Sequence, residues 1–590
     1  MKKLLIAIAV LVVVAVAAAG IFLATFDVNK YKGLIESKAG EALRSQVKIG
    51  SIKLTLTNSL AVEIRGLSIF EEGKEAPALY VDRTQVSLKL LPLLRKSIEV
   101  GAVTVDQPRL IVVREAGVVR VLGVNPLSKN AKSELSSQTS AAMPALAFAI
   151  SQVKITEGEI DYRDLMVTPA SQTIVKHLNV TLKDVSLAGP IRFDADAAVF
   201  GDKTDVRLQG EATDLAGGKP ELRNFTAAID LGLMDHGLLA RAVPAVKQAG
   251  LREDFGGKIE ARVDRVVLGP SGPEDLSVKL KVTDGRVGLT AVKPYFENIR
   301  LDASVDDKSV QIDDLSLQFS GGTVKAKGAV QDYRQTPRSQ VELAVQGVRI
   351  DPFVPVTSEG KALVEGAVSL AFKGSASGAA WPEISRTLNG EAALEFQQGV
   401  KLNLNIIREL LGKLSMFPGL VSTLEKNLPE SYRPKLTQQS TILNSLRHTF
   451  PIRDGAVQIR DLQVSTDFFS ARLDADAQLS GALDGNGTVQ LDQTFSKGML
   501  DGFPQTELLA NSVSQIELPL ILKYAEGKFS VLPDVEKIIR NLAAGGGAKA
   551  LSGLLSGMAE KSSTDAAQQP ASQETAPAKK DKISSWLSKI

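Results

Sequence analysis

The chain has 590 residues, with 69 Lys and Arg against 67 Asp and Glu, so its formal net charge is only +2. This balance, without any basic block, argues against nucleic acid as a partner. The sequence has no cysteine, which excludes disulfides, thiolate metal sites and a thiol nucleophile. The three histidines, His177, His236 and His448, are isolated and lack metal-ligand spacing. We therefore expect neither a metal site nor a cofactor.

Residues 4–26 form an uninterrupted apolar stretch behind Met1-Lys2-Lys3. At ~1.5 Å rise per residue, a helix of this length can cross a ~30 Å hydrocarbon core. A cleaved signal peptide is the alternative, but its apolar region has only ~7–15 residues. The stretch therefore predicts an uncleaved single-pass anchor, with the bulk of the chain beyond the membrane. Representative anchor residues are Leu4, Leu11, Val16, Phe22 and Phe26.

After the anchor, residues 29–42 are expected to be helical, and then a period-two alternation of apolar and polar residues begins. Ile52, Leu54 and Leu56 alternate with polar residues, which is typical of a half-buried strand. The pattern continues to about residue 531 and predicts a mainly β fold: an elongated, curled antiparallel sheet with few short helices. Further helices are expected at residues 232–248, 402–417, 437–446 and 533–558.

Shifts in composition suggest how the chain is organised. An anchor (1–26) leads into a first β segment (27–124), and a Ser-, Lys- and Ala-rich stretch (125–147) is expected to be a flexible linker. Central β repeats (148–380) and a C-terminal β segment with helices (381–531) follow. A C-terminal helix (532–560) precedes a tail (561–590) whose Ala, Gln, Ser and Pro content predicts disorder.

Three strands share an internal repeat. Residues 192–197 have the sequence RFDADA, residues 300–305 RLDASV and residues 472–477 RLDADA. An Asp-Gly pair precedes two of them, at Asp284-Gly285 and at Asp454-Gly455, and such pairs favour hairpin turns. The recurring unit predicts a repetitive antiparallel meander.

The acidic residues of these repeats, and the DGNG sequence at 484–487, raise the possibility of a calcium site. A calcium loop needs carboxylates at alternating loop positions and a bidentate acid at its end. In an alternating strand the acids instead share the solvated face, which is the interpretation that we favour.

Motifs for enzyme chemistry are absent from the sequence. Residues 374–378 have the spacing of a nucleophile elbow, but Ala376 occupies the nucleophile position. The Gly-Lys pairs lack the remainder of a phosphate-binding loop, and no GxGxxG follows an expected strand. We therefore predict a protein that is not an enzyme.

Strands with one apolar face must bury that face against something. Helices are few beside an expected 25–30 strands, so they cannot cover the whole sheet. Either the sheet curls into an apolar groove that takes lipid, or the chain forms a series of dry β-sandwich domains. The aliphatic composition, with aromatic residues at only 5%, fits a smooth wall along which acyl chains can slide. The residues expected to line the groove are Leu54, Leu56, Val86, Leu88, Phe193, Ala195, Leu301, Val305, Leu473, Ala475 and Leu479.

Several stretches give the chain a resemblance to a known family. They are residues 26–43 (FDVNKYKGLIESKAGEAL) behind the anchor, residues 98–121 (IEVGAVTVDQPRLIVVREAGVVRV), residues 283–330, residues 388–411 and residues 452–481. In this order they resemble the AsmA family of diderm bacteria, which is related to the bridge-like lipid transfer proteins.

The resemblance implies a long sheet rolled into an apolar groove, held in the inner membrane with its bulk in the periplasm, that moves phospholipid toward the outer membrane. The expected partners are phospholipid, the inner membrane and a periplasmic or outer-membrane protein. The alternative is a non-enzymatic scaffold or assembly factor that influences outer-membrane protein biogenesis through exposed strand edges. The C-terminal residues 582–590 (KISSWLSKI) could dock at an interface as a basic amphipathic helix or form a free tail.

Overall fold

A computed structural model describes residues 27–544, except 57–59, 90–99, 125–149, 168–169, 187–188, 216–219, 244–245, 247–249, 253, 270–271, 291, 355, 358, 397–398, 413–419, 503 and 526–527. The predicted anchor and the predicted linker lie outside the described residues, as does the tail. The fold is mainly β: within the described part, 26 strands belong to one mostly antiparallel sheet and three strands to a second sheet. The chain divides into two compact units.

Unit 1 comprises residues Met1–Gly288 and Ser304–Asp307. Its strands are β1 (Gln46–Lys48), β2 (Ser51–Leu56), β3 (Leu60–Phe70), β4 (Pro77–Leu88), β5 (Val100–Glu115), β6 (Val118–Val121), β7 (Ile150–Asp164), β8 (Ser171–Val185), β9 (Ile191–Ala198), β10 (Val206–Thr213), β11 (Glu221–Asp230), β12 (Gly256–Gly269), β13 (Gly272–Glu274) and β14 (Ser277–Gly288). Its helices are η1 (Val28–Tyr31), α2 (Lys32–Leu43), η2 (Leu231–Leu233) and α5 (His236–Ala242).

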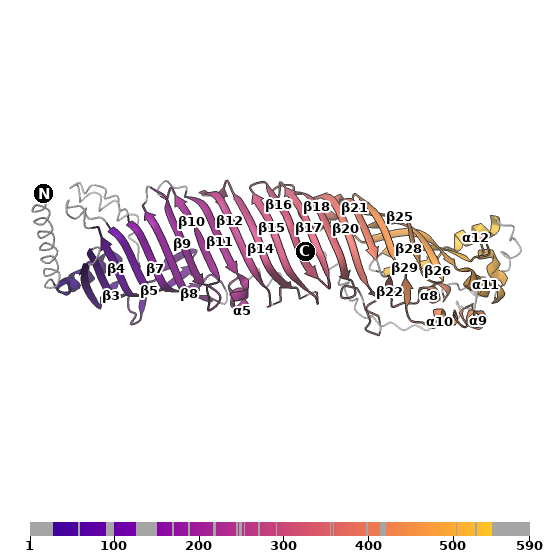
Figure 1. The fold of residues 1–590 in the computed structure, drawn as a ribbon, viewed down its shortest axis with the longest axis horizontal. Coiled ribbons are helices and arrows are strands. Elements are labelled where there is room, and N and C mark those ends of the chain that lie inside the picture. Colours follow the sequence, from indigo (N-terminus) through magenta and orange to yellow (C-terminus); the bar gives the residue numbers. More distant parts are fainter. Residues whose placement is uncertain are drawn as a thin grey trace, which may run out of the picture. The chain divides into compact units, whose positions relative to one another are not determined.

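Most strands of unit 1 pair with the strand that follows them in the chain (Figure 1). β1 and β2 both pair with β3, and the antiparallel order continues through β4 and β5. β5 then pairs with β7 in parallel, from Ala102↔Gln152 to Arg114↔Asp164. The prediction of an antiparallel meander is wrong at this point. β7 begins beside the start of β5 rather than beside its end, so the two strands run in the same direction.

The first edge of this sheet is covered by the N-terminal helices. Asn29 Oδ1 accepts a hydrogen bond from the backbone N–H of Ile52 (2.9 Å), and Glu36 Oε1 accepts one from the N–H of Ile49 (2.6 Å). Lys32 Nζ donates to the carbonyl of Gly50 (3.2 Å). Polar side chains of η1 and α2 thus bond backbone groups that an open edge strand would expose.

Residues in the left-handed conformation interrupt the long strands of unit 1. They are Gly66 in β3, Gln107 in β5, Glu157 in β7, His177 in β8, Asn224 in β11 and Asp284 in β14. At each of them the apolar alternation changes phase, for example from Ile64 to Leu67 across Gly66. A left-handed residue makes a bulge that adds one residue to the strand, so the apolar side chains before and after it stay on one face. Asp284-Gly285, expected to form a hairpin turn, is such an interruption inside β14, so that prediction is wrong.

Unit 2 comprises residues Leu289–Ala303 and Lys308–Ile590, and β15 (Tyr295–Asp306) contributes to both units. Its other strands are β16 (Ser309–Phe319), β17 (Gly322–Gln331), β18 (Arg338–Arg349), β19 (Val364–Glu365), β20 (Ala367–Ser377), β21 (Asn389–Phe396), β22 (Val400–Leu402), β23 (Thr441–Leu443), β24 (Leu446–Arg453), β25 (Ala456–Ser465), β26 (Phe469–Gln478), β27 (Ala482–Leu491), β28 (Glu517–Ala525) and β29 (Lys528–Pro533). Its helices are α7 (Trp381–Thr387), α8 (Ile406–Gly412), α9 (Leu420–Asn427), α10 (Arg433–Thr437), α11 (Gln493–Gly502), η3 (Pro504–Leu509) and α12 (Val535–Ala544).

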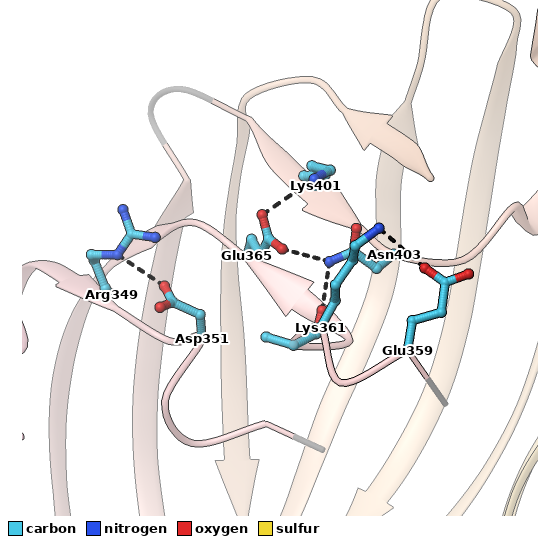
Figure 2. Close-up of polar contacts among 8 residues, drawn as sticks. Arg349, Asp351, Glu359, Lys361, Glu365, Lys401 and Asn403 are labelled. Carbon is cyan, nitrogen blue, oxygen red and sulfur yellow. Dashed lines mark hydrogen bonds and ion pairs between the residues drawn. The ribbon is translucent and has the colours of Figure 1, made fainter. Parts of the chain in front are cut away.

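Antiparallel neighbours run from β16 to β29 in unit 2, with two excursions of the chain. β18 pairs with β20, and β21 pairs with β24, although residues 350–366 and 397–445 lie between these strands in the sequence. The excursions meet in the small sheet β19–β22–β23. Figure 2 shows its polar contacts: Glu365 accepts from Lys401 (3.3 Å) and from Asn403 (2.6 Å), and Asn403 also donates to the carbonyl of Ala362.

Two-residue hairpins connect several strands. Ala116-Gly117, Ser320-Gly321 and Asp454-Gly455 each have positive φ at both residues, which is the type I′ turn that suits the twist of a hairpin. The hairpin predicted at Asp454-Gly455 is therefore confirmed. The sheet narrows here, since the paired register of β24 and β25 contains only Ile452↔Val457 and Arg453↔Ala456.

The expected helices have mixed outcomes. The helix expected at residues 29–42 is confirmed by η1 and α2, and α5, α8 and α12 occupy parts of three other predicted ranges. The helix predicted over residues 437–446 is wrong, because Thr441–Leu443 form β23 and β24 begins at Leu446. Across the residues that the structure describes, no helix has the length and apolar character needed to span a membrane.

Candidate functional site

The apolar face of unit 1 is built from residues that lie opposite one another across many strands. One row begins at Leu54 in β2 and passes through Val62, Val86, Val103, Val153 and Leu182 to Phe193 in β9. The neighbouring row joins eleven strands: Ile52, Ile64, Thr84, Val105, Ile155, Val180, Ala195, Leu208, Ala227, Ala261 and Leu280. Ten of these eleven residues are apolar, so the registers align the apolar sides of consecutive strands.

Phe193 extends over its neighbouring strand because Gly210 leaves room for its ring. Gly210 lies opposite Phe193 in the register of β9 and β10, and a Cβ built on Gly210 would come within 3.0 Å of the tip of the Phe193 ring. The ring centroids of Phe193 and Phe225 lie 6.2 Å apart. A larger residue at position 210 would displace the Phe193 ring from the apolar face.

Unit 2 has an equivalent face on strands β16 to β24. One row consists of Leu315, Ala326, Leu343, Phe372, Ala392 and Phe450. The next row, two residues away along each strand, consists of Leu317, Val324, Val345, Leu370, Leu394 and His448. These side chains are half-buried. His448 is thus on the apolar side, with its ring 4.7 Å from that of Phe450.

A third row of this face contains three glycines. It consists of Ile312, Gly328, Val341, Gly374, Gly390 and Ile452. A Cβ at any of the three glycines would come within 3.0 Å of backbone or of the Phe372 ring. Val341, flanked by Gly328 and Gly374, keeps 39% of its surface exposed. The glycines thus allow close packing of the neighbouring strands and of the Phe372 ring, which a larger residue at these positions would disturb.

The opposite face of the same strands is charged. Lys327, Glu342, Lys373 and Glu391 lie in one row, and Glu342 forms ion pairs with Lys327 and with Lys373, both at 2.8 Å. Hydrogen bonds from Lys327 and then Lys373 lower the pKa of Glu342 to about 2. A shallow hollow of about 530 Å³ on these strands has a mixed lining of charged and apolar residues. It is lined by the charged row, by Asp313, Asp314 and Lys325, and by Ala326, Leu343, Ala344, Ala371, Phe372 and Ala393.

The apolar face changes character further along unit 2, where helices cover it. One buried cluster joins these helices to the sheet. It contains Leu424, Leu428 and Leu436 on and beside α9 and α10, Phe495 and Met499 of α11, and Val489, Leu518 and Leu520 of the sheet. The Phe495 side chain is 0% exposed. Within the described residues, no member of β16–β21 belongs to this cluster or to the smaller one around Met234, Leu239 and Phe255.

Polar contacts hold these helices in place. The amide nitrogen of Asn405 donates to the carbonyls of Lys435, Leu436 and Gln438, and its oxygen accepts from the N–H of Arg408. The hydroxyl of Tyr432 donates to Asp492 at 2.6 Å, and this bond raises the pKa of Tyr432. Bonds of this kind between α8, α10 and the end of β27 favour a single arrangement of the cover.

The predicted lining residues lie in three places. Leu54, Leu56, Val86, Leu88, Phe193 and Ala195 occupy adjacent register rows of unit 1. Leu301 and Val305 lie in β15 on either side of buried Ala303. Leu473 and Ala475 lie in β26, and Leu479 directly follows that strand. Ala475 is 5% exposed and Leu473 shares a row with Leu520 of the helix-covered cluster.

Sequence reasoning missed the left-handed residues and the glycine row, both of which shape the apolar face. A detectable signal existed for the first: the alternation slips by one residue at a polar residue or a Gly, as at Asp461 between Ile459 and Leu462. The predicted anchor residues Leu4, Leu11, Val16, Phe22 and Phe26 lie outside the described residues.

The acidic repeat residues are placed on strands. Asp194 and Asp196 lie in β9, Asp474 and Asp476 in β26, and the DGNG sequence lies inside β27 rather than in a loop. Over the described part of the chain, no group of three His, Asp or Glu side chains is arranged to hold a metal ion.

Comparison with protein families agrees with this architecture. Residues 1–228 match the model of the AsmA family, whereas the search of curated proteins found no match. Proteins of this family are generally non-enzymatic and act in the bacterial envelope, in roles related to outer-membrane biogenesis or lipid transport. The first 228 residues of the chain, less than half of its length, are thus similar to the AsmA family.

Proposed function

We propose that the apolar face of the sheet shields or conducts phospholipid acyl chains. In this proposal the N-terminal apolar segment anchors the protein in the inner membrane, with the bulk of the chain in the periplasm. The protein then supports phospholipid transport to the outer membrane and the integrity of that membrane. It needs no cofactor and catalyses no reaction.

The observation that carries the proposal is the pairing of continuous apolar rows with incomplete burial. A row such as Leu315 to Phe450 crosses six strands, yet its side chains stay half-buried and outside the buried clusters of the described residues. Each acyl CH₂ placed on such a face gains about 0.8 kcal/mol at every position along it. A chain that slides across equivalent rows therefore meets only small changes in free energy.

Photocrosslinking can test the proposal on the full chain in cells. A benzophenone amino acid at Val341 would lie on the apolar face, and the same residue at Gln340 would lie on the opposite face of β18. Both positions are exposed, so neither substitution disturbs a core. We expect a phospholipid adduct, identified by mass spectrometry, at position 341 and not at position 340. Equal labelling of the two positions, or no lipid adduct at 341, would contradict acyl-chain binding.

A scaffold for outer-membrane protein assembly is the second candidate. Val118 and Val119 in β6 favour it, because a short strand exposes both valines by about 60%. A Val118→Ser/Val119→Ser double variant separates the two functions. Loss of outer-membrane protein assembly with unchanged lipid adducts at position 341 would favour the scaffold, and unchanged assembly would favour lipid transport.

A further inference from the structure

Helix α2 contacts the protein through polar side chains and exposes apolar residues in its first turn. Lys32 and Glu36 face the edge of the sheet, where they bond the backbone of Gly50 and Ile49. These two residues, one helical turn apart, also form an ion pair at 3.9 Å. The side of α2 that a soluble protein would make apolar is thus occupied by charged residues that cap strand backbone.

The opposite side of η1 and α2 carries large apolar residues. Leu34 is 60% exposed, Tyr31 is 50% exposed and Ile35 is 38% exposed. Helical spacing places these three residues on one face, and one turn further along that face the exposed Lys38 and Glu41 form an ion pair at 2.8 Å. A surface helix of a soluble domain normally buries such a stripe, so this arrangement indicates that something apolar lies against it.

The position of α2 in the chain indicates what that is. Only residues 27–31 separate α2 from Phe26, the last residue of the apolar stretch 4–26. Five residues span at most about 18 Å even when fully extended, and residues 28–31 are already wound into η1. If the apolar stretch enters a bilayer, the first turn of α2 must lie close to the surface of that bilayer.

We propose that α2 lies in the lipid interface of the membrane in which the chain is anchored, with Leu34 and Ile35 at the boundary between headgroups and acyl chains. Tyr31 has the amphipathic ring favoured at headgroup depth, and the exposed Lys30 can reach lipid phosphates. The polar side of the helix would meanwhile hold the first edge of the sheet next to the membrane. This inference rests on the proposed membrane attachment.

The absence of cysteine allows a direct test on the full chain, since every thiol is then an introduced one. Single variants Leu34→Cys and Ile35→Cys place a fluorescent label on the apolar face, and Ser37→Cys places one on an exposed polar position of the same helix. A fourth variant, Val16→Cys, reports on the apolar stretch itself. Each labelled protein is reconstituted in vesicles of phosphatidylethanolamine and phosphatidylglycerol, with and without bromine on the acyl chains.

We expect labels at positions 34 and 35 to shift to the blue, to be quenched by brominated lipid and to resist aqueous iodide. The label at position 37 should be quenched by iodide. Iodide quenching at position 34 equal to that at position 37 would overturn the proposal, as would protection of position 34 from both quenchers, because protein would then cover it.

The label at position 16 tests the membrane attachment separately from the interfacial position of α2. Lipid quenching at position 16 without lipid quenching at position 34 overturns the interfacial helix and leaves the membrane attachment standing. No lipid quenching at position 16 overturns the attachment, and the interfacial helix with it.

Discussion

Two stretches of unit 2 carry apolar rows of similar composition, but the described residues cover only one of them. On β26–β28 the helices α9, α10 and α11 close over the sheet, so that Leu491 and Phe495 are fully buried. On β16–β24 the rows remain half-buried, and Val341 is 39% exposed. An apolar face thus becomes a dry core only where the chain supplies helices to cover it. In the proposed function, the uncovered stretch is the part of unit 2 that binds acyl chains.

The largest expected difference between the two stretches comes from one substitution made twice. Phe495→Ala removes a fully buried ring and should lower the free energy of unfolding by about 3–5 kcal/mol. Phe372→Ala removes a half-exposed ring and should cost about 1–2 kcal/mol. Urea unfolding followed by circular dichroism measures both. Equal losses of unfolding free energy for the two variants would show that the two stretches are buried to the same extent, and would contradict the difference between them.

The covering helices depend on a buried amide. Asn405→Ala deletes three hydrogen bonds to the carbonyls of α10 and its C-terminus, and it leaves those buried carbonyls without this donor. We expect a loss of about 1–3 kcal/mol in stability. Hydrogen exchange should show faster exchange in α8 and α10 and unchanged exchange in β17 and β18. A control variant, Asn444→Ala, removes an exposed amide and should have little effect.

A left-handed residue, Asp461, lies in β25, the strand that connects the two stretches. Asp461 in β25 has φ of 49°, which a β-branched residue adopts only with strain. Asp461→Val should therefore cost about 1–2 kcal/mol, whereas Asp461→Gly should be tolerated. The matched control is Gln463→Val, because Gln463 has an extended backbone in the same strand. Similar stabilities for the Val and Gly variants at position 461 would contradict a conformational requirement.

The smallest effect concerns the charged row behind the uncovered stretch. The folded-state pKa of Glu342 is about 2, below its ordinary value of 4.5, so the folded state binds this proton less readily than the unfolded state. Its contribution to stability is present above about pH 4.5 and is lost as the pH falls toward 2. The side chain is exposed, so the effect is small and screened by salt. The unfolding midpoint of Glu342→Gln should differ from that of the native chain at neutral pH and converge with it near pH 2. A constant difference would show that the ion pairs do not act through this titration.

The sequence was sufficient to predict the β class, the alternation and the first helix, because these depend on local patterns such as that of Ile52, Leu54 and Leu56. It was insufficient wherever the secondary structure or strand pairing of a segment depends on another segment that is distant in the sequence. Residues 437–446 have an apolar spacing compatible with a helix, but pairing of Thr441–Leu443 with β22 makes a strand. The parallel pairing of β5 with β7 depends on where the intervening chain returns, which no local pattern records.

The candidate site was predicted in kind rather than in detail. Leu54 and Phe193 were expected on one apolar face, and the registers place them in one row. Asp284-Gly285 was expected to be a turn, but the phase slip that it compensates can be recognised only when the apolar residues on both sides are compared. The cover over β26–β28 is a long-range packing event, so alternation alone could not separate Ala475 from the half-buried residues of β18.

The pairing of neighbouring strands has a consequence for how the protein folds. Most strands can dock on the strand before them as soon as they leave the ribosome or a membrane channel, so few long loops must close and the entropic barrier to each addition is low. The β5–β7 junction is the exception, since β7 pairs in parallel with β5 and therefore begins beside the start of β5 rather than beside its end. Growth of the sheet should pause there, and folding factors that recognise unfinished strands would have their longest opportunity to bind at that point.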